Sequence, residues 1–203
     1  MSGDHGTPEG GSCGVIITDE LDSRPSRLPD YAAESRALNA LAEVMSMDPD
    51  TLLQHLVELA IALTRSESAG ISLLEFGADG QVFRWVATAG SWSCYRDGTI
   101  PANASLCGGV IARDTVVLMK SPERAFPALQ DADARISESL LAPVYIGGVP
   151  VGTLWVVKHQ PDGQFEAEDA RILKCFARFA SAAQQTVNAL EVARAASQKA
   201  EAR

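Results

Sequence analysis

Hydrophobic periodicity divides the chain into a helical first part, a β-rich middle and a helical end. Residues 30–46 repeat their apolar positions at helical spacing, and Asp30 can cap the first turn. The break Asp48-Pro49-Asp50 separates this segment from a second helix, which is predicted to end near Arg65. One apolar stripe marks this second helix: Leu52, Leu56, Leu59 and Leu63.

The pattern changes to that of strands in the middle of the chain. Residues 69–76 and 81–89 flank the turn at 77–80 and predict a hairpin. Residues 139–158 predict a second hairpin around Gly147-Gly148, a pair that can adopt the positive φ angles of a tight turn. Shorter elements are predicted between the hairpins: an irregular strand within 90–101, a helix from Asn103 or Ser105 to Ala112, a strand over 115–119 and a helical turn near 130–138.

A long final helix is predicted from Glu166 onward, with carboxylates in its first turn, where the helix dipole favours them. Its apolar positions alternate by three and four and form a seam of two heptads. The helix should outrun the sheet past Ala183, so the last seam positions need another partner, such as a helix of a second chain. The seam consists of Leu173, Phe176, Ala180, Ala183, Val187 and Leu190.

These elements predict a single α+β domain. Adjacent strands that are joined by tight turns pair antiparallel, which favours an α+β over an α/β arrangement. Residues 1–28 are rich in Gly, Pro, Ser and Asp and are expected to form a disordered tail. The folded domain is predicted over 29–190, and 191–203 are expected to be a fraying helix end.

Composition narrows the classes of partner. The 203 residues suit one domain with extensions. The chain contains neither a run of about 18 apolar residues nor a signal-peptide pattern, so we expect a cytoplasmic protein without a membrane span. A net charge of −9 without a cluster of Lys and Arg argues against nucleic acid and anionic membrane surfaces as partners.

Three segments resemble the GAF domains of bacterial sensor histidine kinases and phytochrome-related sensors. They are Ser105-Leu106-Cys107-Gly108, the stretch from Pro143 through Gly148 to Gly152-Thr153-Leu154-Trp155, and Phe165 to Asp169 before the final helix. The resemblance covers about residues 30–190. It implies a GAF-like antiparallel sheet of about six strands. Terminal helices would cover one face, and short helices and loops would form a small-molecule pocket on the other.

The resemblance also implies a non-catalytic sensory or regulatory module. GAF relatives bind cyclic nucleotides, bilins, haem or small metabolites, or bind nothing, and many are homodimers that relay signals along their terminal helices. For this chain, the resemblance implies a small-molecule or protein ligand, a homodimer through the terminal helices, and a separate histidine kinase or other signalling partner of a two-component system. Two alternatives stay open: an enzyme of the free-methionine sulfoxide reductase type, and a ligand-free dimerisation module. The ligand and any cofactor remain unidentified by the sequence.

Six residues are candidates for the ligand pocket. Cys107 lies near the start of a short helix, whose dipole could lower the pKa of a thiol, or it is a packed apolar group. The aromatic candidates could stack on a planar ligand or belong to the core. Arg124 could pair with an anionic group or lie in solvent. The six are Trp92, Cys107, Arg124, Phe126, Tyr145 and Trp155.

The sequence suggests no catalytic or metal-binding set. Neither His5, His55 nor His159 neighbours a cysteine, which argues against covalent bilin attachment. His159 alone lacks the partners of a haem or metal site. Cys94 and Cys107 could meet, but a third thiol over 115–140, which reductase chemistry would need, is missing. We therefore assign no catalytic residue and no metal ligand.

Overall fold

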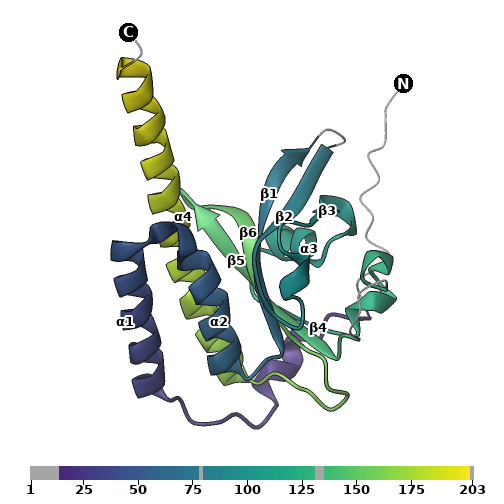
Figure 1. Cartoon of the computed structure of the whole chain (residues 1–203). Coiled ribbons are helices and arrows are strands. Elements are labelled where there is room, and N and C mark those ends of the chain that lie inside the picture. The colour runs from purple at the N-terminus through teal and green to yellow at the C-terminus, as the bar shows by residue number, and fades with distance from the viewer. Residues whose placement is uncertain (1–13, 78–79, 131–134, 202–203) are drawn as a thin grey trace, which may run out of the picture.

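A six-stranded antiparallel sheet forms the centre of the molecule, in the order β3-β2-β1-β6-β5-β4 (Figure 1). The structure is a computed structural model that describes residues 14–77, 80–130 and 135–201. The strands are β1 (Ser68–Gly77), β2 (Gly80–Gly90), β3 (Thr99–Pro101), β4 (Val117–Lys120), β5 (Glu138–Ile146) and β6 (Val149–Lys158). The helices are α1 (Tyr31–Met47), α2 (Leu52–Thr64), α3 (Leu106–Arg113) and α4 (Ala167–Glu201). The predicted α+β class is confirmed.

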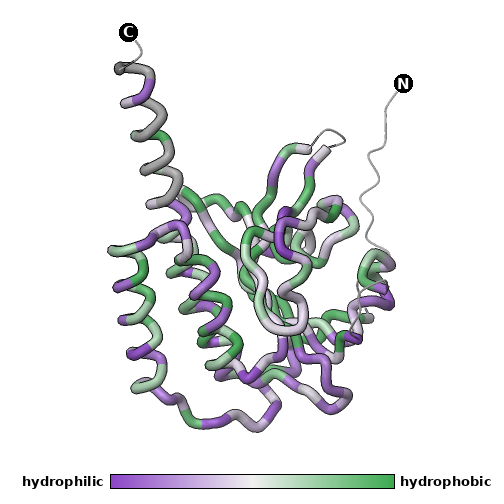
Figure 2. Tube along the Cα trace, viewed as in Figure 1, coloured by the Kyte–Doolittle hydropathy of each residue, from purple (hydrophilic) through white to green (hydrophobic). Residues whose placement is uncertain are grey.

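The helices lie on both faces of the sheet and enclose two hydrophobic cores. On one face, α1, α2 and the first half of α4 pack together over buried side chains such as Leu56 and Phe176. On the other face, α3 and short 3-10 turns cover a second core that contains Phe83 and Leu141. Figure 2 shows hydrophobic residues following the strands and helices, whereas hydrophilic residues dominate the segment that leads into α1. The sheet therefore has a helical face and a loop-rich face, as predicted.

A β-bulge sets which side chains of β2 reach the loop-rich face. Ile71 pairs with Ala87 and Ser72 with Trp85, so one extra residue, Val86, is accommodated in β2. Such an insertion changes the face of the sheet to which the side chains after it point, relative to those before it. As a result, Trp85 lies on the loop-rich face, and Ala87 packs in the core of the helical face.

The second hairpin forms as its sequence predicts. β5 and β6 pair from Glu138↔Lys158 to Ile146↔Val149. The two turn glycines have φ angles of 59° and 82°, which glycine adopts without steric cost. The predicted helical turn near 130–138 differs, because β5 already begins at Glu138, and 135–137 are not helical. Residues 131–134 lie outside the described residues.

The first described segment is packed, which differs from the predicted disordered tail over 1–28. We call residues 14–28 the N-terminal arm. Ile16 bridges Met119 at the edge of the sheet, and the side chain of Leu21 is buried in the core of the helical face. The remaining part of the predicted tail, residues 1–13, lies outside the described residues.

Two arginines explain why the N-terminal arm is held. Arg24 pairs with Glu138 on β5, and its guanidinium also donates to the carbonyl of Phe165. Arg27 pairs with Glu166 and Asp169 at the start of α4. These partners lie more than a hundred residues away along the chain, so local composition could not reveal them.

Helix α4 leaves the body of the domain. Leu173, Phe176, Ala180 and Ala183 are buried, as the seam predicts. The helix extends to Glu201, and its end is rich in good helix formers such as Ala, Glu, Gln and Lys. The expected fraying over 191–203 stays a prediction. Figure 1 shows this last part standing free of the sheet and of α1 and α2. None of the described helices combines the length and apolar character that crossing a membrane requires.

Candidate functional site

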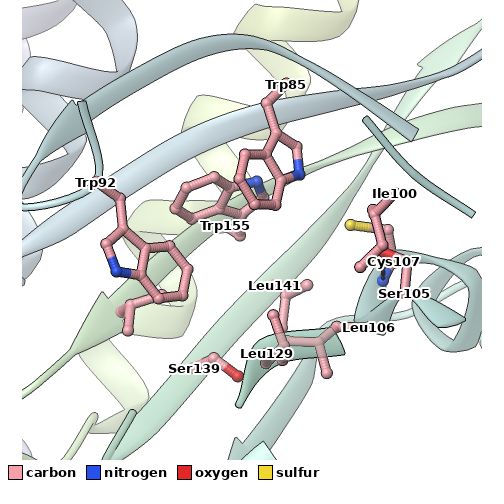
Figure 3. A pocket seen from close by; sticks show the side chains of 11 residues that line it. Trp85, Trp92, Ile100, Ser105, Leu106, Cys107, Leu129, Ser139, Leu141 and Trp155 are labelled. Atoms are coloured by element: carbon pink, nitrogen blue, oxygen red, sulfur yellow. Dashed lines mark hydrogen bonds between the residues drawn. The ribbon is translucent and has the colours of Figure 1, made fainter. Parts of the chain in front are cut away.

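A small cavity lies between the sheet and α3 (Figure 3). Its volume of about 30 Å³ accommodates one or two water molecules. β2, β3, β5, β6, α3 and the short turns around them contribute its walls. The eleven lining residues are all uncharged: Trp85, Trp92, Ile100, Ser105, Leu106, Cys107, Leu129, Ser139, Leu141, Trp155 and Val157.

The three tryptophans of the chain all line this cavity. The rings of Trp85 and Trp92 are nearly parallel, with an interplanar angle of 10° and centroids 6.4 Å apart. Trp155 is inclined by 64° to the first ring and 63° to the second. Tyr95 stands edge-on to both parallel rings, with centroids 5.7 Å and 6.1 Å away. These four rings form an aromatic box at one end of the cavity.

Trp155 can enter the cavity because β1 has a glycine opposite it. Gly70 and Trp155 are cross-strand partners, and a Cβ atom at Gly70 would lie only 2.2 Å from the indole. Nε1 of the same indole donates a buried hydrogen bond of 2.9 Å to Oγ of Ser72. The glycine and this hydrogen bond together fix the ring across the surface of β1.

Two buried polar atoms at the cavity walls are unpaired. Nε1 of Trp92 and Oγ of Ser139 make no hydrogen bond within the part of the chain that the structure describes. Their residues are only 4% and 1% exposed. An unpaired buried polar group destabilises a protein unless a water molecule or ligand satisfies it. In Figure 3 the Ser139 hydroxyl points into the space beside Leu129 and Leu141, and the indole nitrogen of Trp92 lies on the outer edge of its ring.

Cys107 is a packed thiol rather than an activated one. Ser105 caps α3 by accepting a hydrogen bond from the Cys107 backbone, and Thr153 donates a hydrogen bond of 3.0 Å to the Cys107 sulfur. Burial raises the pKa of the Cys107 thiol above its usual value, so the thiolate is disfavoured. Of the two interpretations of Cys107, the geometry favours the packed group.

The burial of Cys107 predicts slow reaction with alkylating reagents. In native protein, Cys107 should react with iodoacetamide at least about tenfold more slowly than the exposed Cys94, because the reactive form is an accessible thiolate. Peptide mass spectrometry after timed alkylation measures both rates, and protein in urea, where both rates should converge, is the control. Equal native rates would show that the thiol is accessible.

Three of the six predicted pocket residues line the cavity, namely Trp92, Cys107 and Trp155. Arg124 lies exposed in the 3-10 turn Pro122–Arg124. Phe126 is partly buried and packs against the surrounding core without lining the cavity. The proposed binding roles of all six remain predictions.

Tyr145 lies elsewhere than the predicted pocket. The register of β5 and β6 shifts between Val144 and Tyr145, where Val151 is the extra residue in β6. The Tyr145 backbone donates a hydrogen bond to Ser181 on α4, and its hydroxyl donates one of 2.8 Å to Asp114. These two hydrogen bonds hold Tyr145 near the end of β5, beside Asp114 and α4, and Tyr145 does not line the cavity.

Two important residues of the cavity were not among the candidates. Trp85 follows Phe83 by two residues on β2, a spacing that places both on one face of a strand. Ser139 is a polar residue at the start of an apolar strand, and such a position can mark a ligand contact. Both signals were present in the sequence.

The histidine candidate has ordinary hydrogen-bond partners. His159 Nε2 lies 2.8 Å from Oγ of Ser68, and Nδ1 lies 2.9 Å from the carbonyl oxygen of Arg135. Its ring also packs beside Trp92, with centroids 5.3 Å apart. Among the described residues, His, Cys, Asp and Glu form no group of three or more that could hold a metal ion.

The sheet order, the helical face and the covered cavity define a small α+β domain of the sensory and regulatory class. Within this class, the chain belongs to the GAF domain family, because the model of that family matches residues 46–184. The chain has no match among curated proteins.

Solved structures agree with this assignment at the level of the fold. The GAF domain of an Acinetobacter phosphoenolpyruvate-protein phosphotransferase is 16% identical, with a TM-score of 0.66 over 80% of this chain and 97% of that chain. The photosensory core of a Stigmatella aurantiaca phytochrome is 13% identical, with a TM-score of 0.60 over 77% of this chain and 37% of that chain. A free methionine-R-sulfoxide reductase from Neisseria meningitidis, solved with its substrate, is 17% identical, with a TM-score of 0.62 over 82% of this chain and 97% of that chain. Similarity at this level of identity establishes the fold alone.

Proposed function

We propose that this GAF domain is a non-catalytic sensory module that binds a small molecule in the cavity between the sheet and α3. The observation that carries the proposal is the unpaired hydroxyl of Ser139, which is buried in a wall of aromatic and aliphatic side chains. A wall of this composition with few polar groups is typical of ligand sites. The cavity accommodates only water in this structure, so a larger ligand has to displace some of the side chains that line it.

Strand β6 offers a route from the cavity to the helices. Trp155 and Val157 line the cavity, whereas the intervening Val156 packs in the core beneath the helical face. A displacement of Trp155 therefore acts on a strand whose other side supports α2 and α4. We propose that ligand binding is relayed in this way to α4 and onward to a cytoplasmic histidine kinase or another signalling protein.

Native mass spectrometry and an absorption spectrum of protein purified from its source cells test the binding proposal. We expect mass in excess of the chain, or recovery of a bound compound after incubation with a small-molecule extract of the same cells. A visible band would identify a pigment or haem. A bare chain mass after incubation with the extract would contradict small-molecule binding and favour the ligand-free dimerisation module.

The same proposal includes a homodimer through the terminal helices. The heptad positions of α4 continue in the sequence to Val187 and Leu190, and Val192 on the free part of the helix is 71% exposed. Substituting Leu190→Asp should weaken the dimer by at least about tenfold, because a charge at a seam position is not tolerated between packed helices.

Light scattering across a concentration series measures this dimerisation. Ala189→Asp, at an exposed position outside the seam, is the matched control and should leave the dimer intact. A monomeric parent chain, or equal weakening by both substitutions, would contradict a dimer through this seam.

The enzymatic alternative has the fold of the Neisseria reductase in its favour and the burial of Cys107 against it. Thiol-dependent turnover of free methionine sulfoxide distinguishes the two. We expect no turnover above that of a Cys107→Ser variant. Turnover that the substitution abolishes would replace the sensory proposal by a catalytic one.

A further inference from the structure

The aromatic box limits the shape of what can bind. A flat ring between two aromatic faces needs about 7 Å between them, at about 3.5 Å for each contact. The parallel rings of Trp85 and Trp92 have centroids 6.4 Å apart, which is the upper limit of the present gap between their faces. The gap must therefore widen before a ring can enter. Trp85 and Tyr95 are both only partly buried, so they can move outward without unpacking the sheet.

The side chains that line the cavity limit the charge that a ligand can carry. All eleven lining side chains are uncharged, and the raised pKa of Cys107 keeps its thiol neutral. A phosphate, carboxylate or ammonium group enclosed here would lose its hydration without gaining a counter-ion, which is strongly unfavourable. Aromatic boxes also bind quaternary ammonium groups. A cation would leave the Ser139 hydroxyl without an acceptor for its proton, whereas an uncharged molecule with a polar edge can pair with it.

We propose that the cavity binds an uncharged, flat heteroaromatic molecule, with its ring between Trp85 and Trp92 and its polar edge at the Ser139 hydroxyl. The inference rests on the proposed ligand-binding function and adds the chemical class of the ligand. Trp155 forms the floor on which the edge of the ring lies. Ser139 is the residue that distinguishes a ring with a hydrogen-bonding substituent from a plain hydrocarbon.

Three related compounds separate the charge classes. Nicotinamide is uncharged, nicotinate carries a carboxylate and 1-methylnicotinamide carries a positive charge, and all three share one ring. In protein labelled with ¹⁵N in its indoles, the chain's only three tryptophans give three signals, all from the cavity. We expect nicotinamide to shift these signals saturably, and each charged compound to require at least about tenfold higher concentration.

Substitutions test the two contacts separately. Ser139→Ala should weaken nicotinamide binding about three- to tenfold, the usual effect of one neutral hydrogen bond. Trp85→Ala should weaken it about five- to hundredfold, as removal of a stacking ring does. Ser46→Ala and Tyr31→Ala, at exposed positions on α1, are the matched controls and should bind as the parent chain does.

Tighter binding of 1-methylnicotinamide or nicotinate than of nicotinamide would overturn the inference in favour of a cation or an anion site. Unchanged affinity in Ser139→Ala would equally overturn it. If none of the three compounds shifts the indole signals while native mass spectrometry finds a bound compound, the ligand class is wrong and the sensory function stands. If neither experiment finds binding, both proposals fail.

Discussion

Replacing Glu138 with alanine is expected to lower the free energy of unfolding by about 3–5 kcal/mol. The Glu138 side chain, 1% exposed on β5, accepts hydrogen bonds of 2.9 Å and 2.8 Å from Arg24, and another of 2.8 Å from the backbone of Phe165. The hydrogen bonds that Arg24 donates to Glu138 raise the pKa of the Arg24 guanidinium, so it stays charged. The substitution leaves this cation, 11% exposed, without its buried partner and leaves the Phe165 N–H unpaired.

A second partner of Arg24 supplies the control. Glu20 pairs with the same guanidinium at 2.6 Å but is 51% exposed, so Glu20→Ala should cost less than about 1 kcal/mol. Urea denaturation followed by circular dichroism measures both variants. Equal losses would mean that the burial of Glu138 contributes nothing, and that the N-terminal arm is held by its apolar contacts instead.

Substituting Gly70→Ala should disturb the cavity directly. The new methyl group would lie 2.2 Å from the Trp155 indole, so the ring must leave its place and its hydrogen bond to Ser72 is broken. Overpacking of this kind costs about 1–3 kcal/mol. We expect lower stability, a change in tryptophan emission and loss of ligand binding at the cavity.

Two further variants test whether steric displacement is the cause. Gly109→Ala on α3 meets only the flexible end of Arg113 at 3.4 Å, so it should be neutral or stabilising. The double variant Gly70→Ala/Trp155→Leu should be less destabilised than the sum of its single changes, because the smaller side chain leaves room for the methyl group. An unchanged emission spectrum in Gly70→Ala would contradict the placement of the indole.

The sequence predicts the regular elements well because they have a period. The helical stripes and the two hairpins follow from spacing and turn glycines alone. The N-terminal arm has no such period: Arg24 and Arg27 are held by partners that only the tertiary fold brings near. A bulge is equally invisible to periodicity, since one extra residue exchanges the faces of a strand. The extra residue Val86 in β2, for example, places Ala87 on the opposite face of the sheet from Trp85.

The alternation along β6 has a consequence for how such a domain can diversify. Thr153, Trp155 and Val157 face the cavity side, whereas Leu154 and Val156 pack beneath the helices. Substitutions at positions 153, 155 and 157 can alter ligand preference, while the residues at 154 and 156 keep their contacts with the core beneath the helices. Related domains can therefore change the ligand that they bind through point mutations on one side of this strand. The packing of its other side on the helices, which carries the signal onward, stays the same.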